Sequence, residues 1–446
     1  MQVKLTRHNK LKVFFSAMLA LTIAFSIIGL PACVSAAGKL TYQDLIISLG
    51  NDESELMFTW YAAQRTGRVA IRAQGDGKYK KFTAVNTYRG GQYIHKATVT
   101  GLKPSTVYDY MLIGENGTAS GVHTVKTGNP SNFSFIAVGD AQIDANNLAA
   151  SGQGWGATVN KAAENFPVSF LVSMGDQVDN ISPDNTSAEY TTYLSPCEFT
   201  GLPASHVMGN HEFYHNSQLF ADHFSFPNRY AADEVNYWYR YGNALFMILD
   251  SNYKNIATHR NFLDKAIASN RDAKWRIVAF HESLYSEGAY INHSASYRTS
   301  WISAFDELGI DVALSGHDHS YTRTYQMLGN KPRKDQVWID SAGNLQSDPT
   351  AIRYNTVLNP TGTLYITLNS SSGNKYYSFS AQAPAYFSAA RHQYYKPEFS
   401  IINITENMFN ITTYQSDTMA VLDNYTIVKD MGVITTNPFR DVRVTD

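Results

Sequence analysis

The sequence predicts a mixed α/β core preceded by an all-β domain. In residues 40–127, short stretches of alternating polar and apolar residues are separated by turn signals, which is typical of a β-sandwich. From residue 131 onward, the apolar runs lose this alternation and are separated by helical patterns. Continuous apolar runs are typical of strands buried on both faces, so the second part is predicted to be an α/β sheet covered by helices. A chain of 446 residues is also too long for one ordinary domain.

The composition excludes several classes of protein. The chain has 36 basic and 38 acidic residues, a formal net charge of −2, so we expect no broad basic surface and no nucleic-acid scaffold role. Its hydrophobic fraction of 44% is that of a globular protein rather than a disordered one.

Residues 1–36 are predicted to be a signal peptide. Four basic residues and no acidic ones precede an uncharged apolar run over 13–30, and small residues then allow cleavage near Ala36. Two alternatives remain open, namely a lipoprotein lipidated at Cys33 and a retained membrane anchor. All three place the functional domain outside the cytoplasm, secreted or at the cell surface. No other segment is long and apolar enough to span a bilayer, so the cleaved, mature form is expected to have no membrane span. With Cys33 assigned to the signal, Cys197 is predicted to be a buried free thiol.

The all-β domain is assigned to residues 40–127. Val69, Ile71 and Ala73 alternate with other residues along one predicted strand, and turn signals follow at 75–77 and later at 103–105. The stretch 101–110 resembles the late turn and strand of a fibronectin type III domain. Residues 127–130 form the predicted linker.

The α/β domain is assigned to residues 131–435. Its buried strands are predicted at 133–138, 168–174, 244–249, 276–280 and 312–314. Apolar stripes predict helices over 257–270 and 297–308. Beyond about residue 320 the pattern is β-rich again, with strands predicted at 364–368, 399–404, 408–414 and 425–428.

Five short segments share one pattern, in which a buried strand ends at residues that can bind metal. These residues are Asp140, Asp176, Asn210, His281 and the pair His317 and His319. Ligands bind outside the carboxyl ends of strands in open α/β sheets, so these side chains are expected to meet. Oxygen and imidazole ligands suit Fe, Mn or Zn. The set is too large for one tetrahedral ion, which predicts two metal ions bridged by a carboxylate.

This constellation resembles the calcineurin-like metallophosphoesterases, and among them the purple acid phosphatase-like branch with an N-terminal fibronectin type III-like domain. The resemblance implies an α/β (α+β sandwich) core with two packed sheets flanked by helices. It implies that Asp176 bridges the two ions and that Asp140 and His319 join it on one of them. It places Asn210, His281 and His317 on the other ion, with His211 as the acid or transition-state stabiliser.

Two positions depart from the family pattern. Where purple acid phosphatases have a tyrosine on ferric iron, this chain has Asp179, so we predict a colourless protein. Asp179 is predicted to orient His211 through its carboxylate, although it could instead cap the next helix. Gln142 is the second departure, and it is either a metal ligand through its carbonyl oxygen or a hydrogen-bonding neighbour of the ligands. As a ligand, it would favour harder ions such as Mn or Fe.

The predicted function is that of a secreted dinuclear-metal phosphatase, which hydrolyses phosphate monoesters by attack of metal-bound hydroxide. The substrate would be a phosphorylated small molecule or nucleotide. Tyr285, His293 and Arg298 follow the His281 strand and are the candidate substrate-binding residues. A phosphodiesterase or nucleotide pyrophosphatase on the same site is the alternative. A cell-surface binding protein on this scaffold is the more remote one.

Overall fold

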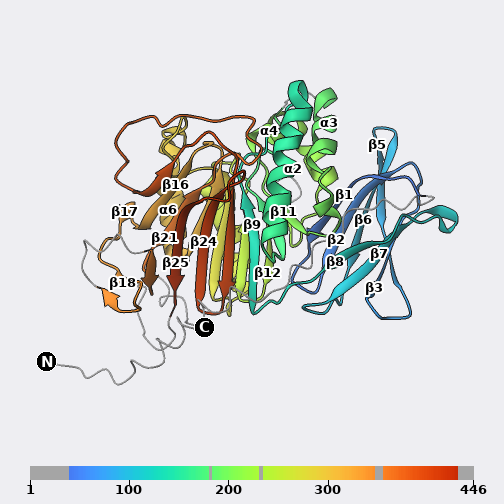
Figure 1. Ribbon diagram of the computed structural model, residues 1–446, viewed down its shortest axis with the longest axis horizontal. Helices are drawn as coiled ribbons and strands as arrows, with labels where there is room; N and C mark the ends of the chain where they lie inside the picture. The colour runs from blue at the N-terminus through green and yellow to red at the C-terminus, as the bar shows by residue number, and fades with distance from the viewer. Residues whose placement is uncertain (1–39, 180–182, 231–234, 347–354, 430–446) are drawn as a thin grey trace, which may run out of the picture.

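The computed structural model describes residues 40–179, 183–230, 235–346 and 355–429 (Figure 1). The predicted signal segment 1–36, with Cys33 and Ala36, lies outside these residues, and so does the predicted domain end at 435. Among the described residues, no helix is both long and apolar enough to cross a membrane.

A sheet of thirteen strands runs through both parts of the chain (Figure 1). Its order is β19-β18-β20-β25-β24-β23-β9-β10-β11-β1-β2-β6-β5. In the α/β part its strands are β9 (Asn132–Val138), β10 (Phe170–Ser173), β11 (Ala204–His206), β18 (Val337–Ile339), β19 (Leu345–Gln346), β20 (Thr356–Leu358), β23 (Glu398–Thr405), β24 (Met408–Gln415) and β25 (Val421–Val428). In the all-β part they are β1 (Gln43–Leu49), β2 (Leu56–Ala62), β5 (Val85–Arg89) and β6 (Gln92–Val99).

A second sheet packs against the α/β half of the first. Its order is β12-β13-β14-β15-β21-β16-β17, and β22 pairs with β16. The strands are β12 (Tyr237–Tyr241), β13 (Ala244–Ile248), β14 (Trp275–Glu282), β15 (Val312–Gly316), β16 (Tyr321–Leu328), β17 (Lys331–Pro332), β21 (Thr363–Thr367) and β22 (Ser388–His392). Between the two sheets, the ring of Phe246 meets those of Phe135 and Phe170, with centroids 5.4 and 5.7 Å apart.

Helices cover the outer faces of both sheets. They are α2 (Leu148–Asn165), α3 (Pro183–Tyr193), α4 (Asn210–His223), α5 (Ile256–Ser269) and α6 (Arg298–Leu308). Trp155 of α2 and Phe220 of α4 join the core of the large sheet, whereas Phe262 of α5 and Trp301 of α6 join a separate core on the second sheet. The predicted architecture of two packed sheets flanked by helices is thus confirmed.

The all-β part is a sandwich, and one of its sheets is continuous with the α/β sheet. Its other sheet has the order β4-β3-β7-β8, formed by β3 (Arg68–Ala73), β4 (Lys80–Thr83), β7 (Val107–Ile113) and β8 (His123–Lys126). We expected a separate sandwich joined by a linker. Instead, β1 lies parallel to β11 through the pair Ser48 and Ala204. This pairing removes an exposed edge from each half.

Side chains of the all-β part also hold the end of α4. The Lys96 ammonium on β6 donates to the main-chain oxygens of Ala221 and Phe224, at 2.6 and 2.5 Å. Ala221 lies in the last turn of α4 and Phe224 caps the helix, and backbone acceptors at a helix end lack helical partners. Since α4 begins at Asn210, the all-β part contacts the helix that carries two predicted site residues.

The free-thiol prediction for Cys197 is wrong. No free cysteine occurs in the described part of the chain, and Cys197 is disulfide-bonded. The sequence contains one other cysteine, Cys33, which lies outside the described residues.

Candidate metal centre

The parallel strands bring the predicted ligands to one place. β9, β10 and β11 are mutually parallel neighbours, and so are β14 and β15. Asp140 and Asp176 lie just beyond β9 and β10, and Asn210 opens α4 after β11. His281 lies near the end of β14, and His317 follows β15. Both sheets therefore deliver side chains at their carboxyl ends, as the strand-end pattern predicted.

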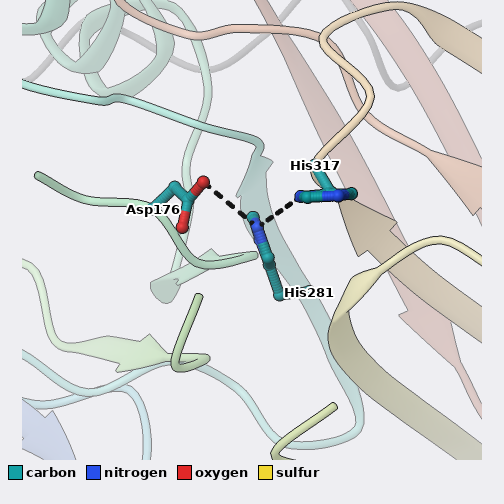
Figure 2. A group of neighbouring side chains, drawn as sticks. All are labelled: Asp176, His281 and His317. Atoms are coloured by element: carbon teal, nitrogen blue, oxygen red, sulfur yellow. Dashed lines mark hydrogen bonds and ion pairs between the residues drawn. The ribbon is translucent and has the colours of Figure 1, made fainter. Parts of the chain in front are cut away.

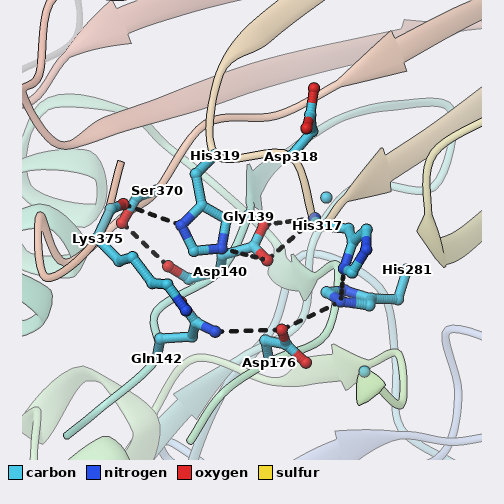
Figure 3. A network of polar contacts seen from close by, with 12 residues as sticks. Gly139, Asp140, Gln142, Asp176, His281, His317, Asp318, His319, Ser370 and Lys375 are labelled. Atoms are coloured by element: carbon cyan, nitrogen blue, oxygen red, sulfur yellow. Dashed lines mark hydrogen bonds and ion pairs between the residues drawn. The ribbon is translucent and has the colours of Figure 1, made fainter. Parts of the chain in front are cut away.

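Two groups of potential ligands share one carboxylate. Asp176, His281 and His317 form the first group (Figure 2), and Asp140, Asp176 and His319 form the second (Figure 3). In each group the ligand atoms lie within 4.8 Å of one another, and every member is buried. The shared Asp176 gives the arrangement of a dinuclear site with a bridging carboxylate.

The first group converges on the Nε2 atom of His281. The His281 Nδ1–H donates to the Met174 main-chain oxygen at 2.8 Å, which leaves Nε2 with a lone pair in the neutral ring. That Nε2 lies 3.2 Å from Asp176 Oδ2, 3.0 Å from Asn210 Oδ1 and 3.1 Å from His317 Nδ1. These atoms are hydrogen-bond acceptors that face one another in a buried site, and such an arrangement is suited to binding a cation. Burial lowers the pKa of His281, but the Asp176 carboxylate, the Asp140 charge and the Met174 oxygen together raise it, to about 9.

The second group is built around Asp140 and His319. His319 Nε2 lies 3.3 Å from Asp140 Oδ1, while its Nδ1–H donates to the main-chain oxygen of Lys375 at 3.0 Å. The Asp140 carboxylate also accepts the main-chain N–H of His317, which lies 3.0 Å from Oδ1 and 2.9 Å from Oδ2. The outer hydrogen bond of His319 fixes the tautomer that presents Nε2 to the site.

Gln142 lies between the two groups. Its Nε2 donates to Asp176 Oδ2 at 3.3 Å, whereas its Oε1 is buried without a partner in the described structure. A buried amide oxygen without a donor is an unsatisfied ligand position. Both interpretations of Gln142 therefore stay open. The hydrogen bond to Asp176 supports a neighbour of the ligands, and the unpartnered Oε1 supports a metal ligand.

The backbone at the site is strained. Gln142, Asp176, His317 and His319 all have positive φ, between 37° and 72°. Non-glycine residues in this region cost free energy and are concentrated at functional sites. Gly175, with φ of 98°, provides the turn into Asp176.

His211 and Asp179 meet, but not through the predicted atoms. The His211 Nδ1–H donates to the main-chain oxygen of Asp179 at 2.5 Å, so the hydrogen bond is made by the Asp179 backbone and not by its carboxylate. The charge of His211 also acts to lower the pKa of the Asp179 carboxyl, so the carboxylate–imidazole pair stays a prediction. The Asp179 backbone is fixed because its N–H donates to Ile143 at 2.9 Å, and this directs its carbonyl at the imidazole. His211 Nε2 remains free to face the site and lies 3.8 Å from Asp176 Oδ2.

Glu212 holds the loop that carries Asp176. Its buried carboxylate accepts the N–H groups of Asp176, Gln177 and Gly209 at 2.7–3.0 Å. Burial and the neighbouring Asp176 raise the pKa of Glu212 to about 8. Glu212 therefore has a structural role, since its carboxylate fixes the main chain next to Asp176 and Asn210.

The three predicted substrate-binding residues have different locations. His293 is at the site, with Nδ1 3.0 Å from His317 Nε2. Tyr285 is 1% exposed in the core of the second sheet, and its hydroxyl donates to Asn330, so its prediction is wrong. The Arg298 guanidinium donates to the Ile291 main chain and to Ser294, which supports the loop rather than the site.

Sequence reasoning missed an aromatic pair beside the ligands. The ring of Tyr290 packs on His317 and that of Tyr377 packs on His319, with centroids 4.3 and 4.7 Å apart. Their hydroxyls lie 3.4 Å apart. Tyr377 is distant in sequence from every strand-end motif, so no local signal identified it.

Two family models match separate parts of the chain. Residues 42–127 match the family described as the N-terminal domain of purple acid phosphatase, and residues 133–321 match the calcineurin-like phosphoesterases. The structure is similar to that of the purple acid phosphatase PPD1 from yellow lupin (Lupinus luteus) seeds. Their TM-score is 0.72 at 18% identity, over 89% of this chain and 76% of the lupin chain.

Two curated proteins are also similar in sequence. Purple acid phosphatase 15 of Arabidopsis thaliana is 24% identical over 288 residues, covering 54% of this chain and 51% of that protein. Acid phosphatase type 7 of Homo sapiens is 22% identical over 292 residues, covering 59% and 64%. The match thus spans about half of the plant relative and less than two thirds of the human one.

Residues 133–321 therefore belong to a calcineurin-like metallophosphoesterase domain. Together with the matched N-terminal domain, it gives the chain the domain arrangement of the purple acid phosphatases, as the resemblance implied.

Proposed function

We propose that this chain is a dinuclear-metal phosphatase that hydrolyses phosphate monoesters. The observation that carries the proposal is the pair of buried ligand groups that share Asp176. Asp140, Asp176 and His319 would hold one ion, and Asp176, Asn210, His281 and His317 would hold the other. Bound there, Fe, Mn or Zn ions would lower the pKa of water and neutralise the phosphoryl oxygens.

The chain's own residues bind the phosphoryl group and supply a proton. The Asn210 amide and the His211 imidazole lie together at the start of α4, next to the ligand groups. Since His211 Nδ1 donates to a main-chain carbonyl, Nε2 is the atom that protonates the leaving oxygen. His293, 3.0 Å from His317, fixes the outer nitrogen of that imidazole and borders the substrate space.

Export from the cytoplasm is part of the proposal. It is supported by the signal-like pattern of residues 1–36 and by the disulfide at Cys197, since disulfides persist in oxidising compartments. Cleavage near Ala36 would remove Cys33, the only other cysteine of the chain. If the bond joins these two cysteines, the mature protein begins before residue 33, which N-terminal sequencing of the exported protein would reveal.

The test measures turnover after metal exchange. The protein is stripped with a chelator, refilled separately with Mn, Fe, Zn or Mg, and assayed on 4-nitrophenyl phosphate and bis(4-nitrophenyl) phosphate. The proposal expects metal-dependent turnover with a preference for the monoester. A preference for the diester would favour the phosphodiesterase alternative. Metal binding without turnover of either ester would contradict a general phosphatase, and absence of both would favour a binding protein.

A further inference from the structure

The loop of residues 373–377 brings a lysine to the metal centre (Figure 3). Two hydrogen bonds of 3.0 Å hold the loop. The Asn374 side-chain Nδ2 donates to the main-chain oxygen of Gln142, and the Lys375 main-chain oxygen accepts from His319 Nδ1. The Tyr377 ring packs on His319 in addition. Both hydrogen bonds join the loop to predicted metal-site residues, so the backbone of Lys375 is held beside the centre.

The ammonium of Lys375 has no carboxylate partner among the described residues. Its neighbour is the Tyr377 ring, with the ammonium nitrogen 5.6 Å from the ring centroid. Burial raises the pKa of Asp179, and the charges of His211 and Lys375 act against that rise. Lys375 is therefore within electrostatic reach of the site without being neutralised by an ion pair.

The other cations near the centre are already engaged. Lys254 forms an ion pair with Glu282, next to His281. Arg298 donates to the main chain of Ile291 and to Ser294. Among the cations that the structure describes around the centre, Lys375 is thus the one whose side chain has neither an ion pair nor a hydrogen bond and can meet an anionic ligand.

We propose that Lys375 binds the third terminal oxygen of a phosphate monoester and thereby selects monoesters over diesters. The inference rests on the proposed function and deepens it. A bound monoester has three terminal oxygens and up to two negative charges, whereas a diester has two terminal oxygens and one charge. The ligand groups with Asn210 and His211 provide for two oxygens, and the remaining one needs a donor from the protein. Lys375, on the loop packed against His319, is placed to provide it.

The experiment compares two variants of Lys375 with a matched control. Lys375→Met removes the charge and Lys375→Arg retains it. Lys396→Met makes the same change of charge at an exposed lysine, whose ammonium pairs with Asp417 at 3.4 Å. The value of kcat/KM is measured on 4-nitrophenyl phosphate and on bis(4-nitrophenyl) phosphate. Binding of inorganic phosphate to the metal-loaded proteins is measured by calorimetry.

Lys375→Met is expected to lower monoester kcat/KM by about 10- to 100-fold, with a comparable loss of phosphate affinity. Diester kcat/KM should change by less than about threefold, since that substrate lacks the third terminal oxygen. Lys375→Arg should recover most of the monoester rate, and Lys396→Met should behave like the unaltered protein.

Equal losses on both esters, or no loss on either, would overturn the inference while leaving the phosphatase proposal intact. Loss of bound metal in Lys375→Met would also overturn it, because the lysine would then support the centre itself. If the unaltered protein hydrolyses neither ester, the phosphatase proposal fails. In that case the phosphate titration still tests the role of Lys375. Equal phosphate affinity in Lys375→Met and the unaltered protein would reject that role.

Discussion

Gly209 has no room for a side chain. A Cβ at this position would lie 2.0 Å from Asp176 Oδ1 and 2.8 Å from Glu212 Oε2. Because both carboxylates are buried and hydrogen-bonded, Gly209→Ala is expected to displace the shared Asp176. We predict a loss of at least one of two bound metal ions, measured by elemental analysis of the purified variant.

The matched control for this change is Gly156→Ala on α2. A Cβ at Gly156 would have no heavy atom of another element within 4 Å. This variant should keep its full metal content, and alanine in a helix interior should be slightly stabilising. Normal metal content in Gly209→Ala would contradict the predicted close packing of the centre.

Asp179 should tolerate the loss of its charge. The acceptor for His211 is its main-chain carbonyl, which Asp179→Asn preserves. We predict kcat within about threefold of the unaltered protein and the same pH profile, whereas His211→Asn should lower kcat by about 10²- to 10³-fold. If the acid limb of the pH–rate profile shifts in Asp179→Asn, this prediction is contradicted and the carboxylate–imidazole pair is supported.

At the residue scale, the sequence could predict ligand types and their positions because each follows a buried parallel strand. Asp140, Asp176 and His281 meet for this reason. It could not predict which atom of Asp179 faces His211, since that depends on the local backbone direction. Lys375 was also missed, because it reaches His319 across 56 residues from a loop without a strand-end pattern.

The short strand β11 contains a buried imidazole that should make stability depend on pH. His206 is 1% exposed and stacks on Phe224, with ring centroids 3.8 Å apart. Burial lowers the pKa of His206 to about 3, below the value of about 6.5 for an exposed imidazole. Between these values the unfolded chain binds more protons than the folded one. The free energy of unfolding therefore falls as pH decreases through this window, and the stabilising contribution of neutral His206 is complete above it.

The predicted contribution of His206 is a loss of about 2 kcal/mol between pH 7 and pH 5. Urea unfolding at the two pH values measures it, with His206→Gln as the comparison. The variant should lose less stability on acidification by about that amount. The same loss in both proteins would show that His206 is not responsible.

At the scale of elements, continuous apolar runs predicted the buried strands well. β9, β13 and β14 start or end within two residues of the predicted ranges, since their burial on both faces leaves a clear signal. The short strands β17 and β19 have two residues each, too few to show a periodicity. The pairing of β1 with β11 was also missed, because it depends on how two sheet edges meet in space.

The whole molecule is organised around the continuous large sheet. We expect the all-β part to stabilise the α/β part through Lys96, which donates to the C-terminal end of α4. Lys96→Met leaves these two carbonyls without their donor and should lower the free energy of unfolding by about 2–4 kcal/mol. Thermal unfolding measures this, with the exposed Lys126→Met as control. Equal melting temperatures for the two variants would mean that the contact does not couple the domains.

The central claim, a dinuclear centre bridged by Asp176, is tested most directly by anomalous scattering from crystals loaded with Mn²⁺. We predict two anomalous peaks about 3.5–4 Å apart, with the Asp176 carboxylate in contact with both. Asp140 and His319 should lie at one peak, and His281 and His317 at the other. A single peak, or two peaks that Asp176 does not bridge, would contradict the account.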